Sequence, residues 1–413
     1  MSEKKSLSRR QFLGTGGALA CASLMSGSTV RAASRSSSNN TVLPVGFIGV
    51  GGMGRTHFNR LSRDPMVRLV AVADPDGLHS ADAVRHAESL GQTLGAYVDF
   101  REMLSQHPDI AAIFIATPDH WHAKATMECL TAGKDVYCEA PLALTITESR
   151  RLVDTARRLN RVLCVGGLQH GTPPAFQQAG AWARSGQIGP LKKAVCFFGP
   201  NPQTPALAEA PPPAHLDWEQ YLGPAPWRPY HRLIHPYHFR YFTDFSGGVL
   251  TEWGVHLFQT AQWGMGKEHS GPLRVEARST WWENNLYEFP RQAHIRYDYG
   301  DVALEWLQED ELELAKRFGP DARYGIQFVG EAGEILVNGT SCVMRGTGSD
   351  RDFESLEPHG DTVSDFFDAV RTRTPLTDAT EAAHRSSVLA LLGNAAVRAQ
   401  QTLTYDPVKE RIV

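Results

Sequence analysis

The chain has 413 residues, a formal net charge of −4 at neutral pH and a pI near 6.5. This charge balance argues against a nucleic acid partner, because proteins that bind nucleic acids usually carry basic stripes. A small-molecule ligand is the better expectation from this charge. The six cysteines form neither a CxxC pair nor a metal-ligand spacing, so we expect no disulfide framework and no metal.

Residues 1–33 are typical of an export signal. Arg9 and Arg10 precede a mildly apolar run from Gly14 to Val30, and small residues near its end suit cleavage. Glycines and serines interrupt this run, whereas a stable membrane span needs about 20 apolar residues, so we expect no membrane span. The pattern resembles a twin-arginine signal; a disordered basic tail is the alternative. The twin-arginine interpretation predicts that the protein folds first and that the twin-arginine export machinery then carries it to the periplasm or another extracytoplasmic compartment.

After a polar linker at 34–41, residues 42–166 are predicted to form a dinucleotide-binding domain. A short apolar strand runs into a glycine-rich turn and then into a helical pattern. In such a turn the first glycine permits a tight bend, the second lets the backbone approach a pyrophosphate, and the third lets the helix pack on the strand. A tight turn without a ligand is the alternative. The residues expected to hold the dinucleotide here are Gly49, Gly51, Gly52, Met53 and Gly54.

A second buried strand pattern ends in Asp74, about twenty residues beyond the glycine-rich turn. A carboxylate in this place accepts hydrogen bonds from the adenosine ribose. It also repels a 2′-phosphate, so we expect NAD as the cofactor and NADP only if Arg55 or Arg85 compensates.

Later strand patterns, counted as the fourth, fifth and sixth of the domain, cover 110–116, 135–142 and 162–165 and alternate with helical patterns. Six such strands predict a doubly wound α/β sheet, in which loops at the carboxyl ends of the strands line the cofactor cleft. The loop after 116 reads TPDHWH. Its residues expected at the cofactor are Thr117, Pro118, His120 and His122, and Trp121 is expected at the substrate.

A proline-rich insertion is predicted at 199–246. Its aromatic side chains suit the C–H faces of a sugar, and its polar tips suit the hydroxyls, so Tyr237 and Arg240 are expected to contact substrate. A rigid arm that packs on a neighbouring subunit is the alternative. The insertion also carries His215, His231, His235, His238, Trp218, Trp227 and Tyr230. The histidines lack the spacing of metal ligands, so no metal site is expected.

Taken in order, GVGGMG, TPDHWH, VYCE, VGGLQH and GGVLTEWGVHLFQTAQW resemble the Gfo/Idh/MocA oxidoreductases, the relatives of glucose-fructose oxidoreductase and inositol dehydrogenase. The resemblance extends to the C-terminal helical segment and covers nearly all of the chain beyond the signal. It implies an N-terminal Rossmann domain followed, at 167–413, by an α/β domain whose open, mostly antiparallel sheet carries the sugar site. It also implies a homo-oligomer.

The resemblance further assigns residues to the site. Glu252 and His256 match the family's acid and histidine pair, which implies that His256 is the acid/base catalyst and that Glu252, one turn away, holds it. A helical salt bridge is the alternative. Glu139 and Gln169 are implied at the cofactor, and His170 at the substrate.

One position departs from the family. The usual Glu-Lys-Pro reads Glu139-Ala140-Pro141, so the cation that would stabilise a developing alkoxide is missing. We expect an NAD(P)-dependent oxidoreductase that oxidises a ring hydroxyl of a carbohydrate and keeps its cofactor tightly bound, because free NAD is scarce outside the cell. The alternatives are a redox-neutral glycoside hydrolase, lyase or epimerase that passes through a transient keto-sugar, and a sugar-binding protein without activity.

Overall fold

The structure, a computed structural model, describes residues 41–167, 174–205, 207–320, 322–346, 348, 350–352 and 361–413. The predicted signal at 1–33 and two predicted site residues, Gln169 and His170, lie outside these ranges. Within them, no helix combines the length and the hydropathy that a membrane span requires.

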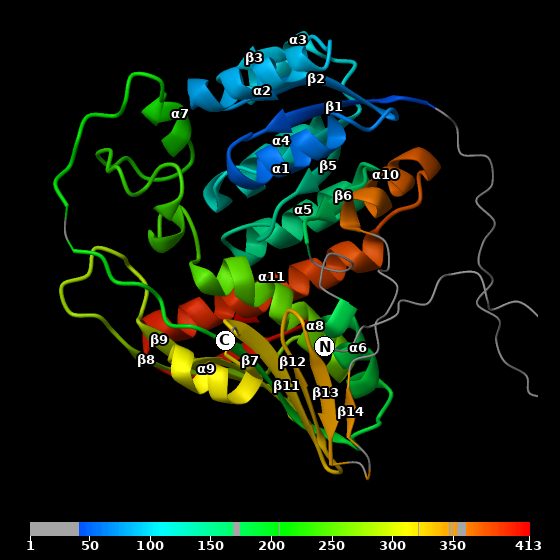
Figure 1. Cartoon of the computed structure of the whole chain (residues 1–413), viewed down its shortest axis with the longest axis vertical. Coiled ribbons are helices and arrows are strands. Elements are labelled where there is room, and N and C mark those ends of the chain that lie inside the picture. The colour runs from blue at the N-terminus through cyan, green and yellow to red at the C-terminus, as the bar shows by residue number, and fades with distance from the viewer. Residues whose placement is uncertain are drawn as a thin grey trace, which may run out of the picture. The chain divides into compact units, whose positions relative to one another are not determined.

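Alternating strands and helices in the first half of the chain build a six-stranded parallel sheet (Figure 1). The strands are β1 Leu43–Ile48, β2 Val67–Ala73, β3 Gly95–Tyr97, β4 Ala112–Ile115, β5 Asp135–Cys138 and β6 Leu163–Val165. Their order is β3-β2-β1-β4-β5-β6. The central strands are almost entirely buried because helices cover both faces. The order reverses between β1 and β4, which is where such sheets bind their ligands.

The helices that alternate with these strands begin at side-chain caps in three of five cases. They are α1 Gly52–Leu61, α2 Gly77–Ser89, α3 Phe100–Gln106, α4 Asp119–Thr131 and α5 Ile146–Arg158. The Asp76 side chain accepts a hydrogen bond from the Leu78 N–H, and the Thr145 side chain accepts one from Glu148 N–H. Helix α1 instead begins at the glycine-rich turn, without a side-chain cap. Its first N–H groups therefore remain available to a ligand.

The second half forms a ten-stranded sheet. Its strands are β7 Leu191–Phe198, β8 Arg274–Thr280, β9 Gln292–Asp298, β10 Ala303–Gln308, β11 Tyr324–Gly330, β12 Glu334–Val337, β13 Cys342–Arg345, β14 Arg351–Asp352, β15 Leu403–Asp406 and β16 Arg411–Ile412. The order is β14-β13-β12-β11-β7-β10-β9-β8-β15-β16, with β7 and β10 parallel and the other described pairs antiparallel. Strand β9 alternates buried and less buried residues, as expected for a sheet with one face on the core.

Helices α6 Pro174–Arg184, α8 Val255–Met265 and α11 Thr377–Ala399 pack on one face of this sheet, and α9 Glu311–Phe318 packs on the other through Leu314. Helix α11, red in Figure 1, also contacts α5 and β6 and so joins the two halves. Helix α10 Thr362–Thr372 returns to the first sheet, where Phe366 packs against Phe114 and Tyr137. The predicted fold class, a Rossmann domain followed by an α/β domain with a mostly antiparallel sheet, is confirmed.

The predicted insertion has a small apolar core of its own. It contains α7 Trp218–Leu222 and the 3-10 helix η1 His238–Tyr241, and the π-helix η2 Leu250–Gly254 follows and leads into α8. Trp218, Tyr230 and Phe245 are buried in this core, while Trp227 and Tyr237 are exposed. Most of its bulky residues therefore stabilise the insertion itself, because burying apolar surface is the main gain available to a segment with little regular structure.

Candidate functional site

A cavity of about 710 Å³ lies at the carboxyl ends of the parallel strands, between the first sheet, the insertion and the η2–α8 helix. This volume is in the range of small-molecule sites. The predicted site residues that line it are Gly49, Gly51, Gly52, Met53, Asp74, Thr117, Pro118, Trp121, His122, Glu139, Tyr237, Arg240, Glu252 and His256. The structure brings these side chains together from positions spread over two hundred residues; the role of each stays a prediction.

The glycine-rich turn has no room for side chains at two of its positions. Gly49 has a φ of +82°, and a Cβ there would lie 2.7 Å from the carbonyl oxygen of Ala116. A Cβ on Gly54 would collide with the Gly49 carbonyl, so the helix packs directly on the strand. Gly52 faces open space. The turn therefore leaves a cradle of backbone N–H groups at the start of α1.

Two polar groups beside the cradle are placed for a dinucleotide. Asp74 accepts main-chain hydrogen bonds from Val50 N–H and Asp76 N–H, each with a donor–acceptor distance of 2.9 Å. These bonds fix its carboxylate at the end of β2. The hydroxyl of Thr117, a cavity-lining residue, is buried without a hydrogen-bond partner. A fixed carboxylate, an unpaired hydroxyl and a glycine cradle fit the ribose and pyrophosphate of NAD. The described residues are thus compatible with the expected cofactor.

Glu139 lies deeper in the cavity and is paired with His57, a residue that the sequence analysis missed. The His57 Nε2 atom lies 2.6 Å from Glu139 Oε1. Burial opposes ionisation of Glu139, but the hydrogen bond to His57 and the nearby rings of His256 and His122 hold its pKa below the usual value. Glu139 is therefore an ionised group. The position of His57, one turn beyond the glycine-rich turn, is a signal that could have found it.

Glu252 lies in the π-helical turn η2 and is paired with Arg240. The Nε atom of Arg240 is 2.7 Å from Glu252 Oε2, and its guanidinium lies 4.1 Å from the centre of the Tyr237 ring. Burial, reinforced by the neighbouring Asp119 carboxylate, raises the pKa of Glu252 to about 7 despite Arg240. Glu252 can therefore gain or lose a proton near neutral pH. Single π-helical turns of this kind often occur at functional sites.

His256 lies in the first turn of α8, one π-helical turn after Glu252, and the structure differs here from the expected pair. The partner of the Glu252 carboxylate is Arg240, whereas the His256 ring packs against Gly167, whose added Cβ would lie 2.8 Å from the ring. Burial lowers the pKa of His256, although Glu139 opposes this. His256 is therefore neutral at neutral pH and can accept a proton. The π-helical turn, which sequence spacing does not reveal, changes how the two side chains face.

His122 is buried with both ring nitrogens facing main-chain carbonyls. Nδ1 donates to Pro141 O at a distance of 2.6 Å, and Nε2 donates to Thr117 O at a distance of 2.9 Å. A carbonyl oxygen only accepts, so both nitrogens must carry protons and the ring is an imidazolium. Burial disfavours this charge, but Cys138 and Asp119 favour it and raise the pKa of His122 to about 10. A fixed positive charge therefore stands beside Ala140, where the family places lysine.

His120 and Trp121, from the same loop, hold the insertion. His120 Nε2 and Trp121 Nε1 both donate to the carbonyl oxygen of Tyr221 in α7, over 2.9 and 3.0 Å. His120 is absent from the lining of the cavity, and Trp121 lies at its wall. Both are placed as contacts between the first domain and the insertion.

A second cluster forms where the insertion meets α2. Asp76 and His79, at the start of α2, lie beside His215 and His235 of the insertion. Residues 76 and 235 are 159 positions apart, so no spacing in the sequence indicates this group.

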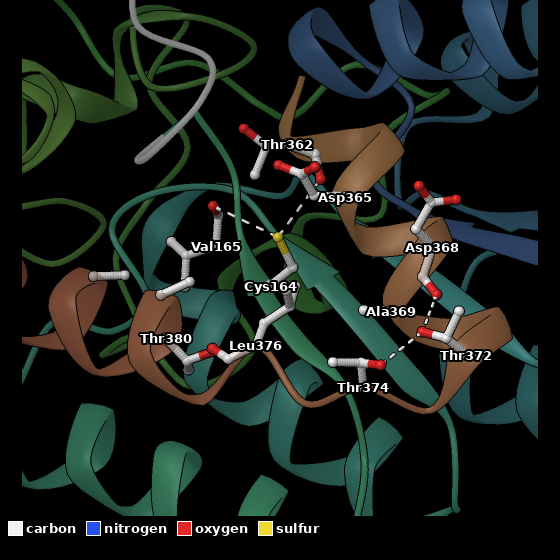
Figure 2. Close-up of a pocket in the computed structure, with 12 residues that line it drawn as sticks. Cys164, Val165, Thr362, Asp365, Asp368, Ala369, Thr372, Thr374, Leu376 and Thr380 are labelled. Atoms are coloured by element: carbon white, nitrogen blue, oxygen red, sulfur yellow. Dashed lines mark hydrogen bonds between the residues drawn. The ribbon is translucent and has the colours of Figure 1, made fainter. Parts of the chain in front are cut away.

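A separate cavity of about 390 Å³ lies between β6, α10 and α11 (Figure 2). Figure 2 shows the Cys164 thiol beside Thr362, whose carbonyl oxygen is 3.8 Å from Sγ. Burial raises the pKa of this thiol well above its usual value. Because the thiolate is the nucleophile, Cys164 is poorly suited to react, and the larger cavity remains the candidate site.

Comparisons with known proteins identify the family. Residues 43–167 match the oxidoreductase family with an NAD-binding Rossmann fold, and residues 202–413 match the C-terminal α/β domain of that family, Gfo/Idh/MocA. The rhizopine catabolism protein MocA of Rhizobium meliloti is 23% identical over 289 residues, which cover 70% of this chain and 76% of that protein. A glycosyl hydrolase family 109 protein of Shewanella sp. (strain W3-18-1) is 35% identical over 125 residues, 29% of this chain, and the match spans only 27% of that relative.

Solved structures show the same fold. A levoglucosan dehydrogenase in complex with NADH has a TM-score of 0.63 at 18% identity, covering 87% of this chain and 98% of that one. An oxidoreductase from Thermotoga maritima has a TM-score of 0.65 at 16% identity, covering 87% and 99%. The second family match alone spans more than half of the chain. The protein therefore belongs to the Gfo/Idh/MocA family of oxidoreductases and carries that family's NAD-binding Rossmann domain.

Proposed function

We propose that the protein oxidises a ring hydroxyl of a sugar or sugar derivative. One observation carries this proposal: a neutral histidine and an acid that titrates near pH 7 lie in the same cavity as the glycine cradle and Asp74. A levoglucosan dehydrogenase among the solved structures supports a sugar as the substrate. When NAD is bound, its nicotinamide supplies the hydride acceptor for this chemistry.

In this proposal His256 takes the proton of the reacting hydroxyl. Its ring is neutral, so it can accept a proton as hydride leaves the same carbon. Ionised Glu252, held by Arg240, accepts a hydrogen bond from a hydroxyl and orients the ring. The exposed face of Tyr237, on which Arg240 stacks, offers a surface for the C–H side of the sugar.

His122 replaces the charge of the absent lysine. Its imidazolium is fixed by two carbonyl oxygens and does not need to move or to lose its proton during the reaction. A preorganised charge in a poorly hydrated site stabilises negative charge that develops on the substrate oxygen. The substitution at Ala140 is thus compatible with an active enzyme.

A redox-neutral reaction is the second candidate, and Glu252 favours it. A carboxyl group with a pKa near 7 can donate a proton to a departing glycosidic oxygen. A transient ketone two carbons away from the carbon that bears this oxygen would acidify the C–H bond of the carbon between them, so that loss of that proton would expel the glycosidic oxygen. Addition of water to the resulting double bond and return of the hydride to the ketone would then complete a redox-neutral hydrolysis. The glycosyl hydrolase family 109 relatives support such a route.

We further propose that the protein is exported folded by the twin-arginine machinery to the periplasm, with its cofactor tightly bound, and that it is a homo-oligomer. The arginine pair in the first residues supports export. Scarce external NAD supports retention of the cofactor through the cycle.

The proposal is tested with purified protein, NAD and a panel of sugars that includes levoglucosan, free hexoses and aryl glycosides. Oxidation predicts that nicotinamide absorbance rises with at least one free sugar and falls when a keto-sugar is added. Release of the aryl group without a lasting change in nicotinamide absorbance would favour the redox-neutral route. Silence with every sugar, in protein shown to bind NAD, would contradict both.

A further inference from the structure

A group of metal-ligand side chains lies outside the proposed reaction, where the insertion meets α2. Asp76, His79 and His235 each offer one ligand atom, and these atoms all lie within 4.8 Å of one another. Asp76 Oδ2 is 2.8 Å from His235 Nε2 and 3.8 Å from His79 Nε2. The second distance is too long for a hydrogen bond, so His79 Nε2 faces Asp76 without a direct bond to it.

We propose that Asp76, His79 and His235 bind a divalent transition metal ion of the zinc type. Two donor atoms that each lie about 2.1 Å from a tetrahedral zinc ion are about 3.4 Å apart, and the two observed distances bracket that value. Imidazole nitrogens together with a carboxylate oxygen are ligands that zinc accepts. The third pair of donor atoms, between the two imidazoles, lies within 4.8 Å, so the side chains would have to move for all three atoms to reach one ion.

The surroundings of His79 and Asp76 match those of metal ligands, whereas Nδ1 of His235 is buried without a hydrogen-bond partner. The other ring nitrogen of His79 lies 3.3 Å from Asp74 Oδ2, and a carboxylate in this position orients a ligating histidine. The second oxygen of Asp76 accepts hydrogen bonds from Leu78 N–H over 2.8 Å and from His215 Nδ1 over 2.9 Å. These contacts hold the carboxylate and leave its first oxygen directed at His79 and His235.

The fourth coordination position would open to the cavity. Both His79 and His235 are among the residues that line it, and the His79 side chain keeps 24% of its surface exposed. The site is therefore reachable by a hydrated ion, and water would complete the coordination.

The bound ion would tie the insertion to the first domain. His235 belongs to the insertion, and Asp76 and His79 belong to the start of α2. Main-chain bonds already join the same two segments, from Gly77 N–H to His215 O over 2.8 Å and from Asp217 N–H to Pro75 O over 2.9 Å. An ion at this seam would lower the free energy of the folded state only, and so raise the melting temperature.

The test uses the full chain, purified without a histidine tag, freed of metal by a chelator and titrated with Zn²⁺ alone by calorimetry. We expect one equivalent to bind and the melting temperature to rise. His235→Gln should weaken binding by about 10- to 100-fold or more and remove the rise. His269→Gln, which changes an exposed histidine elsewhere, should behave as the unchanged protein.

Two results would overturn the proposal: no stoichiometric Zn²⁺ binding by the unchanged protein, or equal binding by His235→Gln. Without stoichiometric Zn²⁺ binding, the cluster would join the insertion to α2 through hydrogen bonds alone. Circular dichroism checks that the variant folds. If the variant does not fold, Co²⁺ is added to the unchanged protein instead. Four-coordinate Co²⁺ absorbs visible light far more strongly than the hydrated ion, so strong absorption would support the site. A spectrum like that of hydrated Co²⁺ would count against it.

Discussion

The two ends of the cavity differ in how their ionisable groups are held. At the glycine cradle, Asp74 is fixed by two main-chain N–H groups. At the other end, burial and neighbouring charges raise the pKa of Glu252, lower that of His256 and maintain a charged His122. Groups with perturbed pKa values gather where protons move. This difference supports the proposal that one end binds the dinucleotide and the other reacts, and each change below acts on one end alone.

The largest expected effect is at the reacting end. His256→Ala should lower the rate of sugar oxidation by about 10² to 10⁴-fold, because the proton of the hydroxyl loses its acceptor. The affinity for NAD, measured by calorimetry, should stay the same. His269→Ala removes an exposed histidine and serves as the matched control. A His256→Ala enzyme within twofold of the unchanged rate would move the proton transfer to another group.

At the binding end, Gly51→Val should weaken NAD binding by about 10- to 100-fold. A Cβ at Gly51 already lies 3.1 Å from the His79 ring, and overpacking of this kind costs about 1–3 kcal/mol. The added methyl groups would also stand in the path of the pyrophosphate. Gly199→Val, at a glycine with open space around it, is the control. Unchanged affinity in Gly51→Val would place the dinucleotide elsewhere.

The fixed charge of His122 gives a smaller effect, because it acts through space rather than by touching the substrate. His122→Gln should slow oxidation about tenfold, less than the ~10²–10³-fold loss of a direct donor. Ala140→Lys in the same variant should recover part of the loss. Nitrogen NMR of the unchanged protein provides a check independent of folding. Both ring nitrogens should be protonated at pH 8, and a neutral ring there would remove this role.

The smallest effect concerns pH. The pKa of Glu252 is raised to about 7, so the carboxyl is protonated below that pH and ionised above it. If ionised Glu252 orients the sugar, the rate should rise severalfold as pH increases through about 7, and Glu252→Gln should lose this step. A rate that instead falls through pH 7 would show that the protonated acid reacts, as the redox-neutral route requires.

The same contrast explains what could be predicted from the sequence. The cradle depends on neighbours in the chain, so Gly49, Gly54 and Asp74 could be placed from spacing alone. The reacting end depends on tertiary contacts: His57 with Glu139, Arg240 with Glu252, and the π-helical turn that separates Glu252 from His256. Spacing alone does not pair these side chains, because His57 and Glu139 are 82 positions apart and meet only when the first domain folds, and Arg240 meets Glu252 only when the insertion folds back on η2.

Hydride transfer within this cavity is the central claim, and a deuterated sugar tests it most directly. The substrate found in the sugar panel is labelled at the carbon that bears the reacting hydroxyl, and enzyme loaded with NAD is quenched after a single turnover. The account predicts deuterium on the nicotinamide ring by mass spectrometry, with little label in the His256→Ala enzyme over the same time. A converted sugar whose deuterium appears only in the solvent would contradict it.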